Sequence, residues 1–255
     1  MGERTSYTPG TFSWVDLNTP DQEAAKAFYG ELFGWAYEDV PAGDGITYSM
    51  ARIDGHDVAA ISPMPPGVEV PHWNCYVTVE DADATAARAR ELGATLFNEP
   101  FDVFDAGRMA VFQDPQGAVL CVWQPKDNIG AGLVNVPGAL TWNDLISPDI
   151  PASAAFYRDL FGWDIEEIPG SDGQYWSITN RGRQNGGLMP MPPGSHPAWN
   201  LYFAVEDVDA TVAKAGELGG ATIMGPMDIP NGSRLAVIRD PQNAVFSIAA
   251  GPMDD

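Results

Sequence analysis

The sequence contains an internal duplication that spans almost its whole length. Phe12-Ser-Trp-Val-Asp-Leu17 returns as Leu140-Thr-Trp-Asn-Asp-Leu145, and Ala27-Phe-Tyr-Gly-Glu-Leu-Phe-Gly-Trp35 returns as Ala155-Phe-Tyr-Arg-Asp-Leu-Phe-Gly-Trp163. Shorter pairs follow in the same order: Trp73-Asn74 with Trp199-Asn200, and Asp114-Pro-Gln116 with Asp240-Pro-Gln242. A repeat of this length predicts two similar domains in tandem. We expect module 1 at residues 8–125, a linker at 126–136 and module 2 at 137–251.

Composition limits the class of partner. At 255 residues, 45% of them hydrophobic, the chain can bury two ordinary cores. Its formal net charge of −22 repels phosphate backbones and anionic lipids, so we expect neither nucleic acid nor a membrane as partner. Two cysteines cannot form a disulfide framework, which suits a reducing compartment. We therefore expect a cytoplasmic protein, either monomeric or homodimeric.

Each copy begins with a strand and a helix. Residues 11–17 and 139–146 are the first strand candidates. Thr19-Pro-Asp-Gln22 then predicts a helix start, with Thr19 as the cap and Gln22 completing a capping box. Ser147-Pro148 gives the second copy a similar start without the box, and Gly34 is expected to end the first helix.

The remainder of the first copy predicts short strands and one more helix. Strand candidates are residues 36–40, 47–53, 57–62, 74–79, 95–98, 108–113 and 118–124, with a proline-rich connector at 63–71. Glu80-Asp81 is expected to cap an alanine-rich helix that ends at Leu92-Gly93. The order is βαβββ twice in each copy, which makes four such units in the chain.

Paired βαβββ units with a Phe-Tyr…Leu-Phe-Gly-Trp segment resemble the vicinal oxygen chelate superfamily, which includes glyoxalase I, bleomycin-resistance proteins and extradiol dioxygenases. The Glu80-Asp81 helix start and the Asp114-Pro-Gln-Gly117 turn before the last strand fit the same resemblance. The tandem arrangement is similar to actinobacterial two-module members, including a mycobacterial antigen and antibiotic-cluster accessory proteins. The resemblance implies an α+β fold of two tandem modules, each an open mixed β-barrel of paired βαβββ units. A fold does not determine function, so the site must be argued from its residues.

The positions that the resemblance assigns to metal ligands do not carry metal-binding side chains. In metal-dependent members, the first and last strands of the βαβββ units supply His and Glu. The aligned positions are Trp14, Asn74 and Cys121 in module 1, and Trp142, Asn200 and Ser247 in module 2. The fourth ligand position falls near Ala59-Ala60 in module 1 and near Asn185-Gly-Gly187 in module 2. An indole has no lone pair for a metal ion, and one Cys beside an Asn is not a thiolate site. We therefore expect no metal and no cofactor.

Positions kept in both copies indicate a ligand cavity instead. Strand side chains alternate, so Trp14 shares a face with Asp16, and Trp142 with Asp144. With the inward residues of later strands and the arginines before each Asp-Pro, the candidate ligand-binding residues are Trp14, Asn74, Tyr76, Arg108, Cys121, Trp142, Asn200, Tyr202, Arg234 and Ser247. The arginines are expected to neutralise the acids or to meet an anionic ligand. Other aromatic candidates near the cavity are Tyr48, Phe101, Phe104, Tyr175 and Trp176.

Alternation also separates the two cysteines. Cys75 is expected to point away from Asn74, and so away from an inward Cys121, which argues against a disulfide between them.

Three functions remain open. The first is a metal-free protein that binds a small aromatic or polyketide-like molecule, for sequestration or as a biosynthetic accessory. The second is a cofactor-independent enzyme that uses Asp16 or Asp144 as general acid or base. The third is a glyoxalase- or dioxygenase-type metalloenzyme with ligands at other positions. Asp16 and Asp144 have a structural alternative too, because a buried carboxylate needs partners whether or not it reacts.

Overall fold

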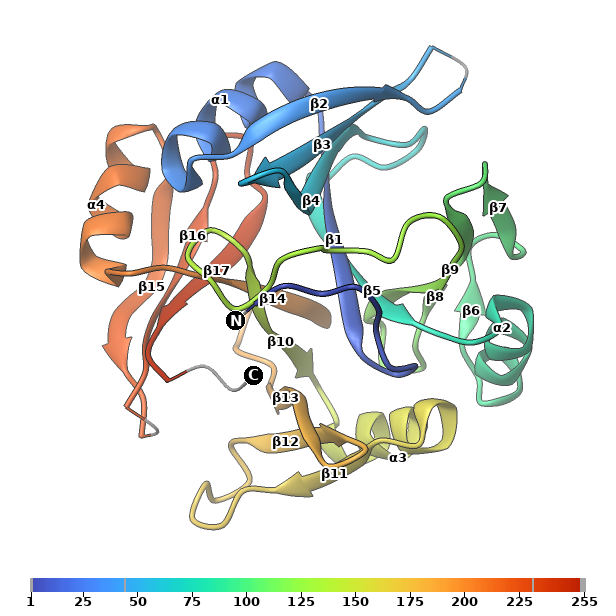
Figure 1. Ribbon diagram of the computed structural model, residues 1–255. Coiled ribbons are helices and arrows are strands. Elements are labelled where there is room, and N and C mark those ends of the chain that lie inside the picture. The colour runs from blue at the N-terminus through green and yellow to red at the C-terminus, as the bar shows by residue number, and fades with distance from the viewer. Residues whose placement is uncertain (1, 44, 231, 253–255) are drawn as a thin grey trace.

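The computed structural model describes residues 2–43, 45–230 and 232–252 and contains two mixed β-sheets, one from each copy of the repeat (Figure 1). Module 1 consists of β1 (Phe12–Thr19), α1 (Gln22–Phe33), β2 (Ala36–Pro41), β3 (Thr47–Ile53), β4 (His56–Pro63), β5 (His72–Thr78), α2 (Ala82–Glu91), β6 (Thr95–Leu96), β7 (Phe101–Val103), β8 (Gly107–Gln113) and β9 (Val119–Pro125). Module 2 consists of β10 (Leu140–Ser147), α3 (Ile150–Phe161), β11 (Asp164–Glu167), β12 (Trp176–Asn180), β13 (Arg183–Pro190), β14 (Ala198–Ala204), α4 (Val208–Glu217), β15 (Ala221–Asp228), β16 (Arg234–Arg239) and β17 (Val245–Ala250). The predicted α+β fold of four βαβββ units is confirmed, with β7 as one short addition.

Each module forms its own sheet. In module 1, β1 pairs in parallel with β4 and antiparallel with β5, which gives the strand order β2-β3-β4-β1-β5-β9-β8-β6. Module 2 repeats this as β11-β12-β13-β10-β14-β17-β16-β15. None of the ladders between described strands joins the two modules. We call the sheet face that carries Asp16 or Asp144 the inner face; the opposite face packs on the helices.

The helix starts correct one detail of the sequence prediction. The cap of α1 is Asp21, whose Oδ1 accepts a hydrogen bond from the backbone N–H of Ala24 at 3.0 Å. Thr19, the expected cap, is the last residue of β1. In α3 the cap is likewise Asp149, one residue after Pro148. Asp81 and Gly34 act as predicted, Asp81 as the cap of α2 and Gly34 as the left-handed end of α1.

The modules meet through an interface with two-fold repetition. The hydroxyl of Tyr29 donates to Asp240 Oδ2 at 3.0 Å, and the hydroxyl of Tyr157 donates to Asp114 Oδ2 at 2.9 Å. A single hydrophobic core extends across the interface, and Phe33 packs on Phe203 with ring centroids 5.0 Å apart. In Figure 1, α1 lies beside α4 and α2 beside α3, so each helix neighbours one from the other module. The repeated Phe-Tyr and Asp-Pro-Gln segments therefore hold the modules together.

Candidate functional site

The inner face of module 1 is centred on the carboxylate of Asp16. Asp16 Oδ2 accepts hydrogen bonds from the hydroxyls of Tyr48 and Tyr76, both at 2.8 Å, and Oδ1 accepts one from Asn74 Nδ2 at 2.8 Å. The indole N–H of Trp14 donates to the Tyr48 hydroxyl at 2.9 Å. Asp16 is only 4% exposed, so these donors replace the water that a carboxylate would otherwise bind.

Module 2 builds a related cluster around Asp144. Asp144 Oδ1 accepts hydrogen bonds from the Tyr175 hydroxyl at 2.7 Å and from Trp142 Nε1 at 2.9 Å, and Tyr202 also bonds to this carboxylate. The amide differs from that of module 1, because Asn200 Nδ2 donates to Ser247 Oγ at 2.8 Å and not to the acid.

A glycine explains how Tyr175 reaches Asp144. Gly187 lies next to Asp144 on β13, and a Cβ at this position would collide with the Tyr175 hydroxyl. The corresponding residue of module 1, next to Asp16 on β4, is Ala60.

Both carboxyl groups have raised pKa values. Burial raises the pKa of Asp16, and hydrogen bonds from Asn74, Tyr76 and Tyr48 offset part of the rise. Burial likewise raises the pKa of Asp144, against hydrogen bonds from Tyr175, Tyr202 and Trp142. Each acid thus has several donors arranged around it, and these donors stabilise its ionised form.

The side chains around each acid do not fit a divalent metal ion. The first-strand and second-unit positions present the indole of Trp14 and the amide of Asn74, and the β4 position is Ala60. Trp142, Asn200 and Gly187 are their counterparts in module 2. Among the described residues, no group of three or more His, Cys, Asp or Glu is placed to hold a metal. One carboxylate already surrounded by hydrogen-bond donors does not supply the three or four ligands that such ions require.

The two arginines lie apart from the acids of the inner faces, which corrects their predicted position. Arg108 pairs with Asp83 of α2, with its Nε 2.6 Å from Oδ2, and Arg234 pairs with Asp209 of α4 at the same distance. Strand alternation accounts for this, because the neighbouring Met109 packs toward the inner face and turns Arg108 toward the helix. Nothing in these contacts supports a ligand-binding role for either arginine.

The remaining candidates lie on the inner faces. Cys121 packs beside Trp14 and Tyr76, and Ser247 takes the corresponding position on β17. Cys75 faces the other way, toward the backbone carbonyl of Trp199, and both cysteines are free. The predicted placement of Cys75 and Cys121 on opposite faces of the sheet is therefore confirmed.

One pair of aromatics has a more direct role than the sequence predicts. Tyr48 of β3 and Tyr175, directly before β12, donate to Asp16 and Asp144. Their equal distance from the fourth-strand residues Ala60 and Gly187 was the available signal. The other aromatics lie elsewhere: Phe101 and Phe104 are exposed, and Trp176 packs under the guanidinium of Arg158.

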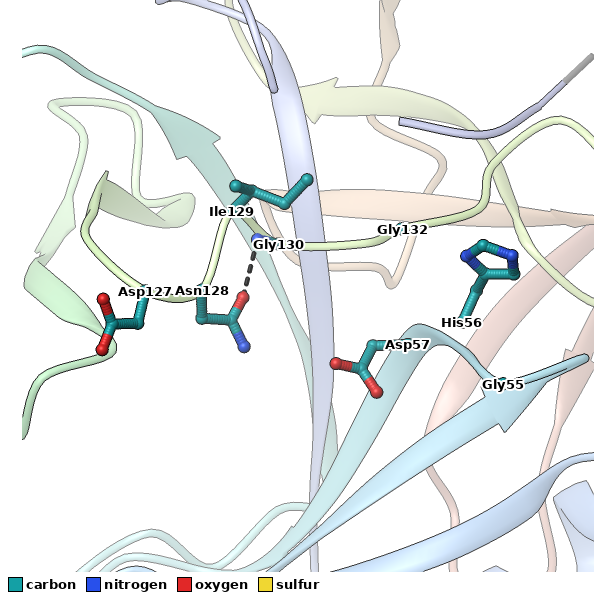
Figure 2. A pocket seen from close by; sticks show the side chains of 8 residues that line it. All are labelled: Gly55, His56, Asp57, Asp127, Asn128, Ile129, Gly130 and Gly132. Atoms are coloured by element: carbon teal, nitrogen blue, oxygen red, sulfur yellow. Dashed lines mark hydrogen bonds between the residues drawn. The ribbon is translucent and has the colours of Figure 1, made fainter. Parts of the chain in front are cut away.

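Two surface pockets lie away from the acids. One of about 260 Å³ is lined by Gly55, His56, Asp57 and, from the linker, residues 127–130 and Gly132 (Figure 2). The other, of about 340 Å³, is lined by Trp176, Pro190 and the start of α3. We place the candidate site on the inner faces, because the oriented polar groups are there. No helix among the described residues is long and apolar enough to cross a membrane.

The duplicated sheets and their inner-face clusters define a glyoxalase-fold protein of two modules. Residues 11–122 and 139–248 match the Glyoxalase/Bleomycin resistance protein/Dioxygenase superfamily, and the chain belongs to that superfamily. It is 45% identical over 255 residues to "Putative glyoxylase CFP32" of Mycobacterium tuberculosis, with 97% of each chain covered. It is 35% identical over 263 residues to "Anthracycline biosynthesis protein DnrV" of Streptomyces peucetius, with 96% of this chain and 94% of the relative covered. The family resemblance seen in the sequence is thereby confirmed.

Solved structures share the fold at low sequence identity. The Mn(II)-bound glyoxalase from Novosphingobium aromaticivorans aligns with a TM-score of 0.66 and 16% identity, covering 98% of this chain and 83% of that one. The 2,3-dioxygenase LapB from Pseudomonas sp. KL28 aligns with a TM-score of 0.68 and 15% identity, covering 96% and 94%. These likenesses concern the architecture alone.

Proposed function

We propose that the chain binds a small aromatic or polyketide-like molecule without a metal ion, and sequesters it or presents it to a biosynthetic enzyme. The composition of the inner faces carries this proposal. Each face presents an indole, two phenols, a carboxamide and a single carboxylate at and beside the positions that hold metal ligands in other members of the superfamily. Aromatic walls with a few oriented polar groups suit a planar organic ligand.

The relatives support a ligand from secondary metabolism. Two Streptomyces proteins that are 35% identical to this chain along nearly their whole length are named for anthracycline biosynthesis. The name "Putative glyoxylase" given to CFP32 favours an enzyme of the glyoxalase type instead. The donor set around Asp16 and Asp144 favours the first of these two directions.

Two measurements on the purified chain test the proposal. Titration with 1,8-dihydroxyanthraquinone, an uncharged planar probe, is expected to quench tryptophan fluorescence in a saturable way. An uncharged probe is required because the net charge of −22 attracts cations nonspecifically. Elemental analysis is expected to find no stoichiometric zinc, manganese, nickel or iron. A stoichiometric metal, or the absence of saturable quenching by planar aromatic probes, contradicts the proposal.

A cofactor-independent enzyme is the second candidate. The raised pKa of the Asp144 carboxyl and its contact with two phenols favour it, because a proton can move within such a cluster. The Tyr175, Tyr202 and Trp142 donors oppose it, since they already occupy the carboxylate that would receive a substrate proton. Unchanged turnover of a candidate substrate by the Asp144→Asn and Asp16→Asn variants would remove this candidate.

A further inference from the structure

The linker fills the inner face of module 1. Ala131 and Val134 are 0% and 8% exposed, and they belong to a buried cluster with inner-face residues of module 1. The other members of that cluster are Trp14, Met50, Ala60, Tyr76, Cys121 and Trp123. The segment expected only to connect two domains is thus part of the interior of the first one.

Backbone hydrogen bonds fix the linker in this place. The N–H of Ala131 donates to the carbonyl of Ser13 on β1 at 2.7 Å, and the N–H of Gly132 donates to the carbonyl of Asp57 on β4 at 2.8 Å. Figure 2 shows the linker crossing β1 between Gly130 and Gly132. Gly130 has a φ of +104°, and a Cβ there would collide with the Ser13 carbonyl, so this close approach requires glycine.

The N-terminal segment holds the linker from outside. The N–H of Arg4 donates to the carbonyl of Gly132 at 2.9 Å, and the hydroxyl of Tyr7 donates to the carbonyl of Ala131 at 2.6 Å. Displacing the linker therefore also breaks these contacts.

The inner face of module 2 is open where that of module 1 is filled. All eight residues of β1 are buried, whereas Thr141, Trp142 and Ile146 of β10 are partly exposed. Two of the large side chains in module 1 have small counterparts in module 2. Met50 pairs with Ala60, and the corresponding residue of module 2 is Ser177, which pairs with Gly187. Trp123 pairs with Met109, and its counterpart is Ala249, which pairs with Leu235.

These differences leave an aromatic surface with polar edges in module 2. Trp142 and Ser177 are partly exposed where their counterparts Trp14 and Met50 are buried, whereas Tyr175 and Asn200 are partly exposed as Tyr48 and Asn74 are in module 1. Within residues 140–230 and 232–250 no buried hydrophobic cluster separate from the shared core covers this face. The face of the Trp142 indole offers a stacking surface. The Ser177 hydroxyl donates to the carbonyl of Glu166 and the Asn200 amide donates to Ser247, and the oxygens of both side chains can accept hydrogen bonds from ligand hydroxyl groups.

We propose that ligand binding is confined to module 2: its inner face takes one flat, hydroxylated or carbonyl-bearing aromatic molecule per chain, stacked on Trp142, while the linker occupies the corresponding space in module 1. The inference rests on the proposed function and adds to it the module, the stoichiometry and the stacking residue. Module 1 then serves as the rigid partner that supports module 2 across their shared core.

Probe binding tests the confinement. Titration of the full chain with 1,8-dihydroxyanthraquinone is expected to give one site. Ser177→Met, which places the side chain of the module 1 counterpart on the open face, is expected to weaken binding at least tenfold. Met50→Leu, a conservative change at the matched position of module 1, is expected to change affinity less than twofold. Two sites per chain, or loss of binding in Met50→Leu with Ser177→Met unaffected, would overturn the inference and leave the proposed function standing.

A second measurement needs no ligand. A cysteine introduced by Ser177→Cys is expected to react with 5,5′-dithiobis(2-nitrobenzoate) at least tenfold faster than one introduced by Met50→Cys. Cys75 and Cys121 are each 2% exposed and give a slow background. The anthraquinone is expected to slow the labelling of Ser177→Cys. Equal labelling rates would show that module 1 is as open as module 2 and would overturn the inference, whereas a rate difference without any probe binding would overturn the proposed function and the ligand site with it.

Discussion

The two modules are alike where they touch each other and different on their inner faces. At the interface, Tyr29 with Asp240 and Tyr157 with Asp114 make the same bond twice. On the inner faces, the linker and Trp123 fill module 1, while module 2 keeps Trp142 partly exposed. Repetition in both copies thus occurs at the interface as well as around Asp16 and Asp144, and does not by itself mark a ligand-binding residue.

The largest expected effect tests the filled face. Trp123→Ala should lower the free energy of unfolding by roughly 3–5 kcal/mol, because it removes a buried indole packed against Gly107 and the linker. The reverse change at the matched position of module 2, Ala249→Trp, should alter it by less than about 1 kcal/mol, because that position is half-buried on an open face. Urea unfolding followed by circular dichroism measures both. Equal costs would show that the two faces are filled alike.

The interface should respond equally in both halves. Tyr29→Phe and Tyr157→Phe each remove a hydroxyl that donates to a buried carboxylate and accepts from a tryptophan N–H, of Trp73 or Trp199 respectively. Leaving those groups without a partner should cost about 2–3 kcal/mol in each variant. A difference of more than about 1 kcal/mol between the two unfolding free energies would contradict the symmetry of the interface.

The linker contact should show a smaller effect. Gly130→Ala should destabilise the chain by roughly 1–3 kcal/mol, since the new Cβ meets the Ser13 carbonyl at a positive φ. Gly194→Ala is the matched control, because Gly194 also has a positive φ but no atom lies within 4 Å of the added Cβ. Gly130→Ala should in addition speed the labelling of Cys121 by thiol reagents. Equal stability of the two variants would mean that the linker is not held against β1.

The smallest expected effect is the pH dependence of stability, in which the two modules should behave alike. Asp16 and Asp144 are each 4% exposed, and burial raises the pKa of both carboxyls. Their folded pKa values exceed the unfolded one, so the stability that each contributes is present below the ordinary Asp pKa of 3.8 and is lost as pH rises through the folded pKa. The stability of the parent chain relative to Asp16→Asn or Asp144→Asn should fall over that window in both cases. If the difference in unfolding free energy between the parent chain and Asp144→Asn did not change with pH, while that for Asp16→Asn did, the open face of module 2 would extend down to the Asp144 carboxyl.

Local patterns predicted the elements well, because they depend on neighbouring residues. The strand expected at residues 47–53 has those bounds, and Gly34 ends its helix as expected. Thr19 was misassigned as a cap because the sequence does not show that β1 continues through it to pair with Pro63. Asp21, two residues on, offers the same kind of oxygen and lies at the true boundary.

The site was predicted only in part, for reasons of tertiary placement. Alternation placed Trp14, Asp16 and Asn74 on one face, where Tyr48 links Trp14 to Asp16 and Asn74 donates to Asp16 directly. The same rule, applied to Arg108 beside Met109, would have turned the arginine toward α2. The position of the linker could not be predicted from local patterns. Nothing in its own sequence shows that Ala131 packs against the inner face of a sheet whose first strand begins at Phe12.

The reciprocal interface also has a consequence for the two halves as separate molecules. The indole N–H of Trp35 donates to the carbonyl of Gly138, and that of Trp163 donates to the carbonyl of Gly10, so each half completes the other's hydrogen bonds. A polypeptide cut within the linker would yield two fragments with complementary aromatic surfaces, in which Asp114 and Asp240 lack their tyrosine donors. Such fragments should associate into the native fold when they are mixed. Each fragment alone should aggregate, because its interface side chains are then exposed to water.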